Sequence, residues 1–299
     1  MNKGVAYAAG AYILWGLFPI YWKNLSGVPA LEILSHRIVW SLIFVIVLLA
    51  VQKKTGWVKP TLRNKRTLLI FFITASVLSI NWLTYIWGVN AGYIIETSLG
   101  YFINPLVSVV LGVIFLRERL RSGQWVAIGI ATIGVLYLTI NYGSLPWISL
   151  TLAFSFATYG LLRKTAPLGA QEGLALETAW MFIPAFIYLL FIERQGTAAF
   201  GHIDFKTTIL LAFAGIATAV PLILFASGAR LIPLSIIGLL QYTAPTIQFL
   251  IGIFVYHEEF SQTSFIGFSI IWMALIIFTI EILSHNKKQA RQIRLGAGD

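Results

Sequence analysis

Long apolar stretches alternate with short polar breaks from one end of the chain to the other. A membrane-spanning helix needs roughly 17 to 25 predominantly apolar residues. Measured against the charged breaks, the apolar runs predict ten spans, of which the sixth is the shortest. These spans cover residues 4–22, 31–51, 68–88, 93–116, 123–141, 147–162, 173–192, 208–227, 232–256 and 263–283. The pattern therefore predicts an all-α membrane protein with ten transmembrane helices.

The second half of the chain repeats the first. The segment from Glu96 to Leu120 returns without a gap when the register is shifted by 140 residues. The matching pairs are Leu99/Leu239, Phe102/Tyr242, Pro105/Pro245, Gly112/Gly252 and Glu118/Glu258. An internal repeat of this length predicts duplicated structural units. We expect a first repeat at 1–142, a second at 143–285 with five spans each, and a basic cytoplasmic tail at 286–299.

The distribution of positive charge predicts the orientation of these repeats. An odd number of spans per repeat makes the second copy enter the membrane from the opposite side. The sequence has 21 Lys and Arg residues, and all but four fall in segments that are cytoplasmic if the N-terminus is inside. The four exceptions are Lys23, Arg37, Arg194 and Lys206. Because cytoplasmic loops are enriched in Lys and Arg, we predict two inverted repeats with both termini in the cytoplasm.

Composition excludes several other classes of protein. The chain is 58% hydrophobic and 11% charged, against about 25% charge in a soluble domain. The net charge of +10 does not indicate a nucleic-acid partner, because the basic residues lie in loops and at the C-terminus. The absence of cysteine excludes disulfides and thiolate metal sites. The first apolar run continues without a small-residue cleavage site and therefore predicts a retained span.

The doubled motif carries a family resemblance. A proline-containing span, a glycine seven residues later and a glutamate at the end of the span resemble the EamA repeat of the drug/metabolite transporter superfamily. Asn81-Trp82, Tyr85-Ile86-Trp87, the run from Glu96 to Pro105 and the run from Leu240 to Thr246 resemble the RarD branch. The resemblance extends over nearly the whole chain.

This resemblance implies a carrier in the bacterial inner membrane that works by alternating access. Spans one to four and six to nine would line a central cavity, with spans five and ten at the periphery. RarD proteins carry a name linked to chloramphenicol sensitivity, and relatives export amino acids and other metabolites. We expect a secondary-active exporter of small organic solutes. The alternatives are an importer or exchanger of an amino acid or metabolite and, in a different class, a membrane sensor or scaffold.

Ionisable residues inside the spans are the first functional candidates, because a charge in hydrocarbon is costly. Those that stand out are His36, Arg37, Glu96 and Glu177. The predicted topology puts Arg37 and Glu96 at similar depths, so we expect an outer contact that closes the cavity to the exterior. A permanent pair, or side chains that reach the headgroups, is the alternative.

The inner end of the carrier has its own candidates. Glu177 occupies the repeat position of Arg37, and we expect it to contact Arg163 or Arg230 near the cytoplasm. His36, Glu96 and Glu177 leave proton coupling open. For His36, however, a hydrogen-bonding or interfacial role is the commoner use of a lone histidine at a helix end.

Aromatic and amide residues form the second set of candidates. They are Trp15, Asn81, Trp82, Tyr85, Tyr101, Asn104, Tyr159, Gln241, Tyr242 and Gln248. Such groups suit a small, partly apolar organic substrate better than a bare ion, although Trp and Tyr also gather at membrane interfaces. Pro105 and Pro245 each remove a helix hydrogen bond and are candidate hinges, or packing kinks.

No catalytic motif accompanies these residues. The sequence has no Walker loop, no His-Glu-x-x-His helix, no Gly-x-Ser-x-Gly elbow and no acidic cluster with metal-ligand spacing. We therefore predict no enzyme activity, no cofactor and no metal. The expected partners are a small-molecule substrate and the lipid bilayer. The sequence leaves the possibility of a homodimer open. In the second repeat, Ile236 and Ala244 occupy the positions of Glu96 and Asn104. Because the two repeats differ at these positions, Glu96 and Asn104 are the favoured recognition residues.

Overall fold

The computed structural model describes residues 3–91, 93–142, 146–256 and 262–296. Over these residues every regular element is a helix, as expected for a backbone that must satisfy its own hydrogen bonds in lipid. The helices are α1 (Lys3–Lys23), α2 (Ala30–Val51), α3 (Val58–Arg63), α4 (Lys65–Asn90), α5 (Ile94–Leu116), α6 (Ser122–Tyr142), α7 (Trp147–Thr165), α8 (Ala170–Arg194), α9 (Phe205–Leu231), α10 (Leu234–Gln241), α11 (Thr243–Phe254) and α12 (Gln262–Gly296).

A helix occupies each of the ten predicted ranges, with two local differences. The short helix α3 lies in what we expected to be a plain basic loop between the second and third spans. The ninth span is divided at Tyr242 into α10 and α11. Eight segments of the described chain are long and apolar enough to cross a membrane. The count of ten crossings stays a prediction.

The two repeat-related prolines have different local effects. Pro105 lies inside α5, which continues through it. Pro245 lies in the first turn of α11, where the missing N–H would have had no partner within that helix. The same residue at equivalent repeat positions therefore accompanies a continuous helix in one half and a break in the other.

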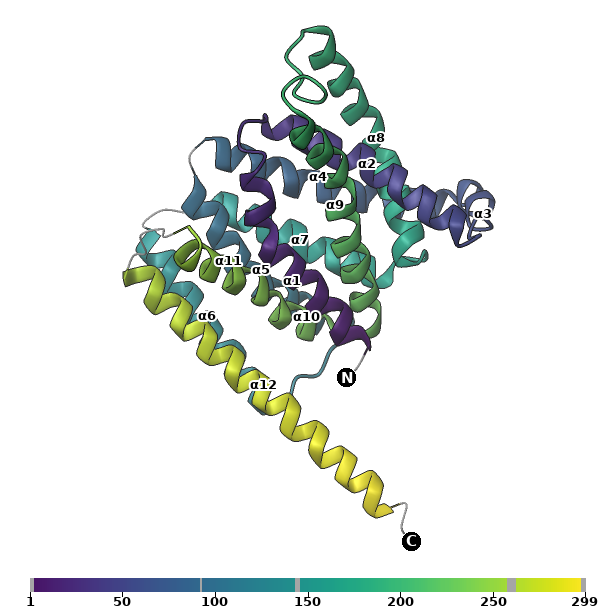
Figure 1. Cartoon of the computed structure of the whole chain (residues 1–299). Coiled ribbons are helices and arrows are strands. Elements are labelled where there is room, and N and C mark those ends of the chain that lie inside the picture. Colours follow the sequence, from purple (N-terminus) through teal and green to yellow (C-terminus); the bar gives the residue numbers. More distant parts are fainter. Residues whose placement is uncertain (1–2, 92, 143–145, 257–261, 297–299) are drawn as a thin grey trace.

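The helices of the two halves are interleaved. Helix α1 packs on α9 and α11, α2 packs on α8 and α9, and α5 packs on α7 and α10. Helices α6 and α12 form a separate pair along one side of the bundle, and α12 runs on past it (Figure 1). The chain therefore forms one bundle with α6 and α12 at its edge. Helix α12 also continues through the expected tail as far as Gly296.

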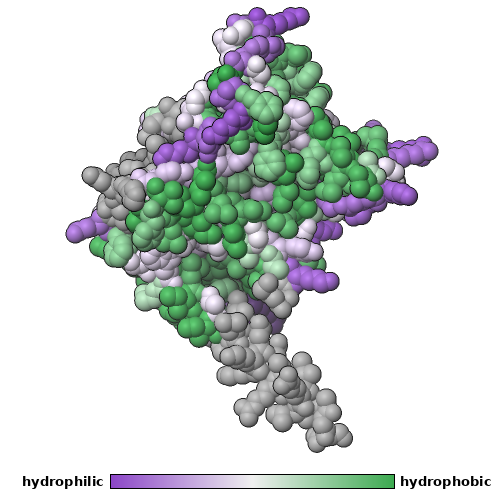
Figure 2. All heavy atoms as spheres, in the orientation of Figure 1, coloured by the Kyte–Doolittle hydropathy of each residue, from purple (hydrophilic) through white to green (hydrophobic). Residues whose placement is uncertain are grey.

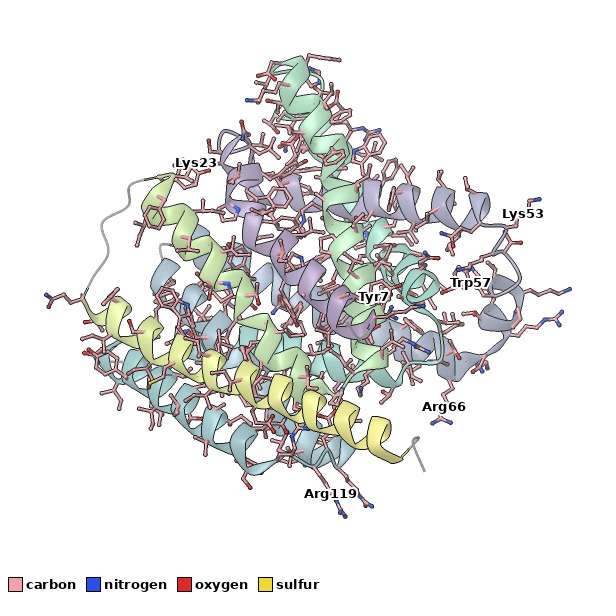
Figure 3. All side chains as sticks on the ribbon, turned by 60° about the horizontal axis from the view of Figure 1, so that its bottom comes forward. Tyr7, Lys23, Lys53, Trp57, Arg66 and Arg119 are labelled. Carbon is pink, nitrogen blue, oxygen red and sulfur yellow. The ribbon has the colours of Figure 1, made fainter. Side chains whose placement is uncertain are left out.

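The surface of the bundle is largely apolar. Figure 2 shows hydrophobic residues over most of the visible face, with hydrophilic residues gathered on the projecting ends. Large apolar side chains in the middle of helices are exposed, among them Ile46 on α2, Phe115 on α5 and Ile183 on α8. An exposed apolar surface of this extent fits a lipid environment. In Figure 3, Lys23 lies on one side of the molecule, and Lys53 and Arg66 lie on the opposite side.

Polar contacts fix the ends of several helices. The carboxylate of Glu118, just beyond α5, accepts hydrogen bonds from the backbone N–H groups of Leu234 and Ser235 (2.6 and 2.9 Å) and from the Ser235 hydroxyl (2.7 Å). A carboxylate at a helix N-terminus satisfies free N–H groups and complements the helix dipole. Asp204 caps α9 in a similar way, and the N–H of Thr207 holds the pKa of Asp204 below its ordinary value.

Glycine permits the closest approach between helices, which is common in membrane bundles. A Cβ added at Gly215 of α9 would clash with the backbone of Trp40 and lie 2.6 Å from the Ser41 nitrogen in α2. The Ser41 hydroxyl donates to the Gly215 carbonyl at 2.9 Å. Gly100 similarly lies against the backbone of Ser149 in α7.

Replacing Gly215 with Ala should lower the stability of the bundle, because backbone atoms of α2 cannot move aside as a flexible side chain can. We expect a loss of about 1–3 kcal/mol, measured as the thermal unfolding midpoint in detergent. Gly129 of α6 is the matched control, because its added Cβ would meet open space. Gly129→Ala should leave the midpoint unchanged or raise it. Equal effects of the two substitutions would contradict the close α2–α9 contact.

Candidate functional site

A cavity of about 300 Å³ lies at the centre of the bundle. Its walls come from α1, α2, α4, α5, α7, α9, α10 and α11, so both halves of the chain contribute. The predicted site residues that line it are Trp15, Arg37, Asn81, Trp82, Tyr85, Tyr101, Asn104, Gln241, Pro245 and Gln248. Helix α8 contributes none of these lining residues, although the seventh span was expected to do so.

In α1, α2, α4 and α5 the lining residues lie toward one end of the bundle. They come from Tyr12 onward in α1, the beginning of α2, the later part of α4 and the first half of α5. The predicted topology makes this the extracellular end of all four helices. Trp22 lines the cavity one residue before Lys23, which the topology also places outside.

Arg37 is the charged side chain among these lining residues. Its Nε donates to the Thr218 hydroxyl of α9 at 2.9 Å. The guanidinium lies over the indole rings of Trp22 and Trp82, at 4.9 and 5.0 Å from the ring centroids. Each such contact contributes about 0.5–2 kcal/mol, with the larger values in dry surroundings. Two aromatic faces and one hydroxyl therefore hold the guanidinium in a fixed place at the cavity wall.

The amides strengthen the cavity walls. Asn81 Nδ2 donates to the Leu152 carbonyl (3.0 Å) and the Ser155 hydroxyl (2.9 Å), which joins α4 to α7. Gln248 Nε2 donates to the Trp15 carbonyl at 3.1 Å and so joins α11 to α1. Asn104 accepts a hydrogen bond from Ser108 one turn later in α5 (3.3 Å). These bonds satisfy amides that would otherwise be costly in hydrocarbon.

An aromatic cluster lies beside the cavity. We define it as Tyr12, Trp15, Phe156, Tyr159 and Phe225, whose neighbouring rings have centroids 5.3–6.2 Å apart. The hydroxyl of Tyr12 is buried and has no hydrogen-bond partner among the described residues. A buried hydroxyl without a partner is uncommon in a folded protein.

Sequence reasoning missed Tyr12, Trp22 and Thr218 as lining residues. A signal for the first two was present. Tyr12, Trp15, Pro19 and Trp22 follow the three- and four-residue spacing of a single helix face, and all four line the cavity. Thr218 gave no comparable signal, because its role depends on the position of Arg37 in a distant part of the chain.

Glu177 and Arg163 form a buried pair away from the cavity lining. Arg163 Nε lies 3.6 Å from Glu177 Oε1, and both side chains are fully buried. Tyr159 donates to Glu177 Oε2 at 3.2 Å, and Arg163 Nη2 donates to the Ala170 carbonyl at 2.9 Å. The contact joins consecutive helices, α7 and α8, across a short connection. The expected contact between Glu177 and Arg163 is therefore present, and its role as an inner gate stays a prediction.

Arg230 has another role. It donates to the carbonyls of Ala166 and Leu168 (2.8 and 2.7 Å), which fixes the connection between α7 and α8. Of the two partners expected for Glu177, Arg163 therefore makes the contact and Arg230 does not.

Three other candidates lie outside the cavity lining, as Tyr159 does. His36 is stacked on Phe200 and lies 3.8 Å from Glu32. Tyr242 is fully buried and donates to the Phe102 carbonyl at 3.1 Å. Pro105 is not among the lining residues, and its carbonyl lies against Gly238 of α10. The side chain of Glu96 lies outside the described part of the structure, so its contact with Arg37 stays a prediction.

Comparisons with known proteins converge on one family. The EamA-like transporter family matches residues 2–140. The RarD protein of Streptomyces exfoliatus is 47% identical over 99% of this chain and 94% of its own length. That of Escherichia coli K12 is 41% identical over 97% and 98%. The uncharacterized transporter YojE of Bacillus subtilis is 49% identical over 93% and 94%.

A solved crystal structure also shares the fold. It superimposes with a TM-score of 0.73 over 93% of this chain and 98% of its own, at 14% sequence identity.

Replacing Arg163 with Met should strongly destabilise the protein, because it leaves the buried Glu177 carboxylate without its cation. Removing one partner of a buried ion pair costs about 3–5 kcal/mol. The Arg163→Met/Glu177→Gln double variant should recover part of this loss, as measured by thermal unfolding in detergent. If the losses of the two single variants simply add in the double variant, the two side chains are not coupled.

Proposed function

Because the chain belongs to the EamA-like transporter family, and within it to the RarD branch, we propose that it is a secondary-active exporter of a small organic solute. The solute would occupy the central cavity and cross a bacterial inner membrane by alternating access. The observation that carries this proposal is the cavity itself. It lies between helices of both halves and is lined by aromatic rings, amides and one arginine. Apolar walls with a few polar groups are typical of sites for small organic molecules.

The packing of the helices supports the proposed inverted repeats. An exchange of the two halves pairs α1 with α7, α2 with α8, α4 with α9, α5 with α10–α11, and α6 with α12. Under this exchange the α1–α9 contact becomes α7–α4, α5–α7 becomes α11–α1, and α2–α9 becomes α8–α4. All six contacts occur in the structure. Major helix contacts that exchange in this way fit two copies of one unit related by a pseudo-two-fold axis.

The closed end of the cavity fits one state of an alternating-access cycle. The predicted topology places the cavity in the extracellular half and the aromatic cluster on its cytoplasmic side. Beyond the cluster, Lys164 Nζ donates to the carbonyls of Ala229 (3.0 Å) and Ile232 (2.5 Å), where α9 ends. Glu118 bonds the start of α10 at the same end of the bundle. We propose that these contacts form the inner seal and open when the cavity faces the cytoplasm.

A cysteine introduced at Ala244 should report the orientation of the cavity. The chain has no cysteine, and Ala244 lines the cavity on α11. In intact spheroplasts, Ala244→Cys should react with a membrane-impermeant maleimide from outside, whereas Ala219→Cys, at a fully buried position of α9, should not. Labelling of Ala244→Cys only in inside-out vesicles would reverse the proposed orientation.

Transport can be tested with matched bulky substitutions. Solutes that raise the thermal midpoint of the purified protein would be assayed for flux into proteoliposomes, with and without a pH gradient. Ala244→Trp should abolish flux because the indole fills the cavity. Val126→Trp is the control, because Val126 is exposed on α6 at the edge of the bundle. If no stabilising solute crosses the membrane, or if Ala244→Trp transports normally, the proposal fails.

A further inference from the structure

The charge balance of the cavity narrows the chemical class of its ligand. Arg37 is a cation, and no described side chain that lines the cavity is acidic. The nearest acid in the same helix, Glu32, is engaged elsewhere, since its Oε1 accepts the N–H groups of Ala199 and Phe200 (2.7 and 3.2 Å). Among the described residues this positive charge has no acidic partner; a positive charge in a membrane-embedded cavity is costly, and an anionic ligand would offset that cost.

The contacts of Arg37 leave the binding end of the guanidinium available. Thr218 accepts from Nε, and the indoles of Trp22 and Trp82 lie against the guanidinium. The structure records no acceptor for the two terminal nitrogens among the described residues. Arg presents its N–H groups in a rigid planar fork that matches a carboxylate with two parallel hydrogen bonds. The surrounding contacts hold this fork in place before any ligand arrives.

From these observations we propose that the solute is an organic monocarboxylate with an apolar body, and that Arg37 binds its carboxylate. This inference rests on the proposed function of the cavity. A phosphate monoester is a poorer fit, because it carries close to two charges and the described lining offers one cation. An amino-acid zwitterion is also a poorer fit. Its ammonium would need an acid, and the faces of Trp22 and Trp82 are already occupied by Arg37.

The rest of the lining suits the body of such a ligand. Three of the helices provide apolar surface to the cavity. The residues are Trp15 and Phe18 of α1, Phe156 of α7 and Leu222 of α9. A body about the size of one aromatic ring system, with a carboxylate at one end, would use all of these groups.

A series of ligands with one body and different charge tests the proposal on the native protein. Indole-3-acetate, indole-3-acetamide, tryptamine and tryptophan share the indole and carry a negative, neutral, positive or zwitterionic side group. Phenylacetate with its amide, and 4-methylpentanoate with its amide, extend the comparison to other bodies. Affinities would be measured by thermal stabilisation of the full chain in detergent. For at least one body, the carboxylate should bind about tenfold more tightly than its amide, or better.

Variants of Arg37 connect the preference to one side chain. Arg37→Gln should remove the advantage of the carboxylate over its amide, and Arg37→Lys should keep a reduced advantage. Arg119→Gln, at an exposed position after α5, is the matched control and should behave as the native protein does. If Arg37→Gln does not fold, the Lys variant and the native ligand series still decide the question.

Several results would overturn the proposal. They are equal binding of carboxylate and amide for every body, tighter binding of tryptamine or tryptophan, and an unchanged carboxylate preference in Arg37→Gln. A carboxylate preference that appears only in Glu96→Gln would mean that Glu96 is the partner of Arg37 in the native chain, and would also contradict it.

The same panel separates this inference from the proposed function. Arg37-dependent binding of a carboxylate that never crosses a proteoliposome membrane would retain the anion site and reject transport. Flux of the neutral or cationic members, unaffected by Arg37→Gln, would retain transport and reject the anion site.

Discussion

Polar groups inside a hydrocarbon layer must find their partners within the protein, and this constraint governs the structure. Glu118 binds the first N–H groups of α10, and Glu32 binds N–H groups just before α9. Glu177 is held by Arg163 and Tyr159. In each case a charged side chain that is unfavourable in lipid joins two segments of the bundle. Arg37 differs, since its charge lies at a cavity wall with a hydroxyl and two indoles around it.

The charged residues therefore fall into two groups: those that join segments of the bundle, and Arg37, which borders the cavity. Arg37 and Glu177 occupy equivalent repeat positions, yet one borders the cavity and the other is buried in an ion pair between α7 and α8. Pro105 and Pro245 diverge in the same way, within a continuous helix in one half and at a break in the other. On the proposed inverted-repeat arrangement, duplication would supply the packing scheme, and the residues that differ between the copies would decide where it opens into a cavity.

The hydropathy pattern predicted the positions of the helices well, because a run of about twenty apolar residues is typical of a membrane-spanning helix. It did not reveal the break at Tyr242, since the apolar pattern continues through α10 and α11. Residue chemistry identified much of the cavity lining, including Arg37, Asn81 and Gln248. It also selected Tyr159, Tyr242 and His36, which lie elsewhere. The sequence does not distinguish a polar aromatic residue that lines a cavity from one that bonds a buried carboxylate. The packing of the helices decides which of the two occurs.

In the proposed transport cycle, the cavity changes its access from one side of the membrane to the other. Spin labels in a bilayer test it directly, with one pair at Ser26 and Tyr93 on the predicted outer side and another at Lys53 and Arg119 on the inner side. These are exposed positions. We expect a transported solute to shift the two distance distributions in opposite directions, so that one pair closes as the other opens. Single, unchanged distances in both pairs during active transport would contradict it.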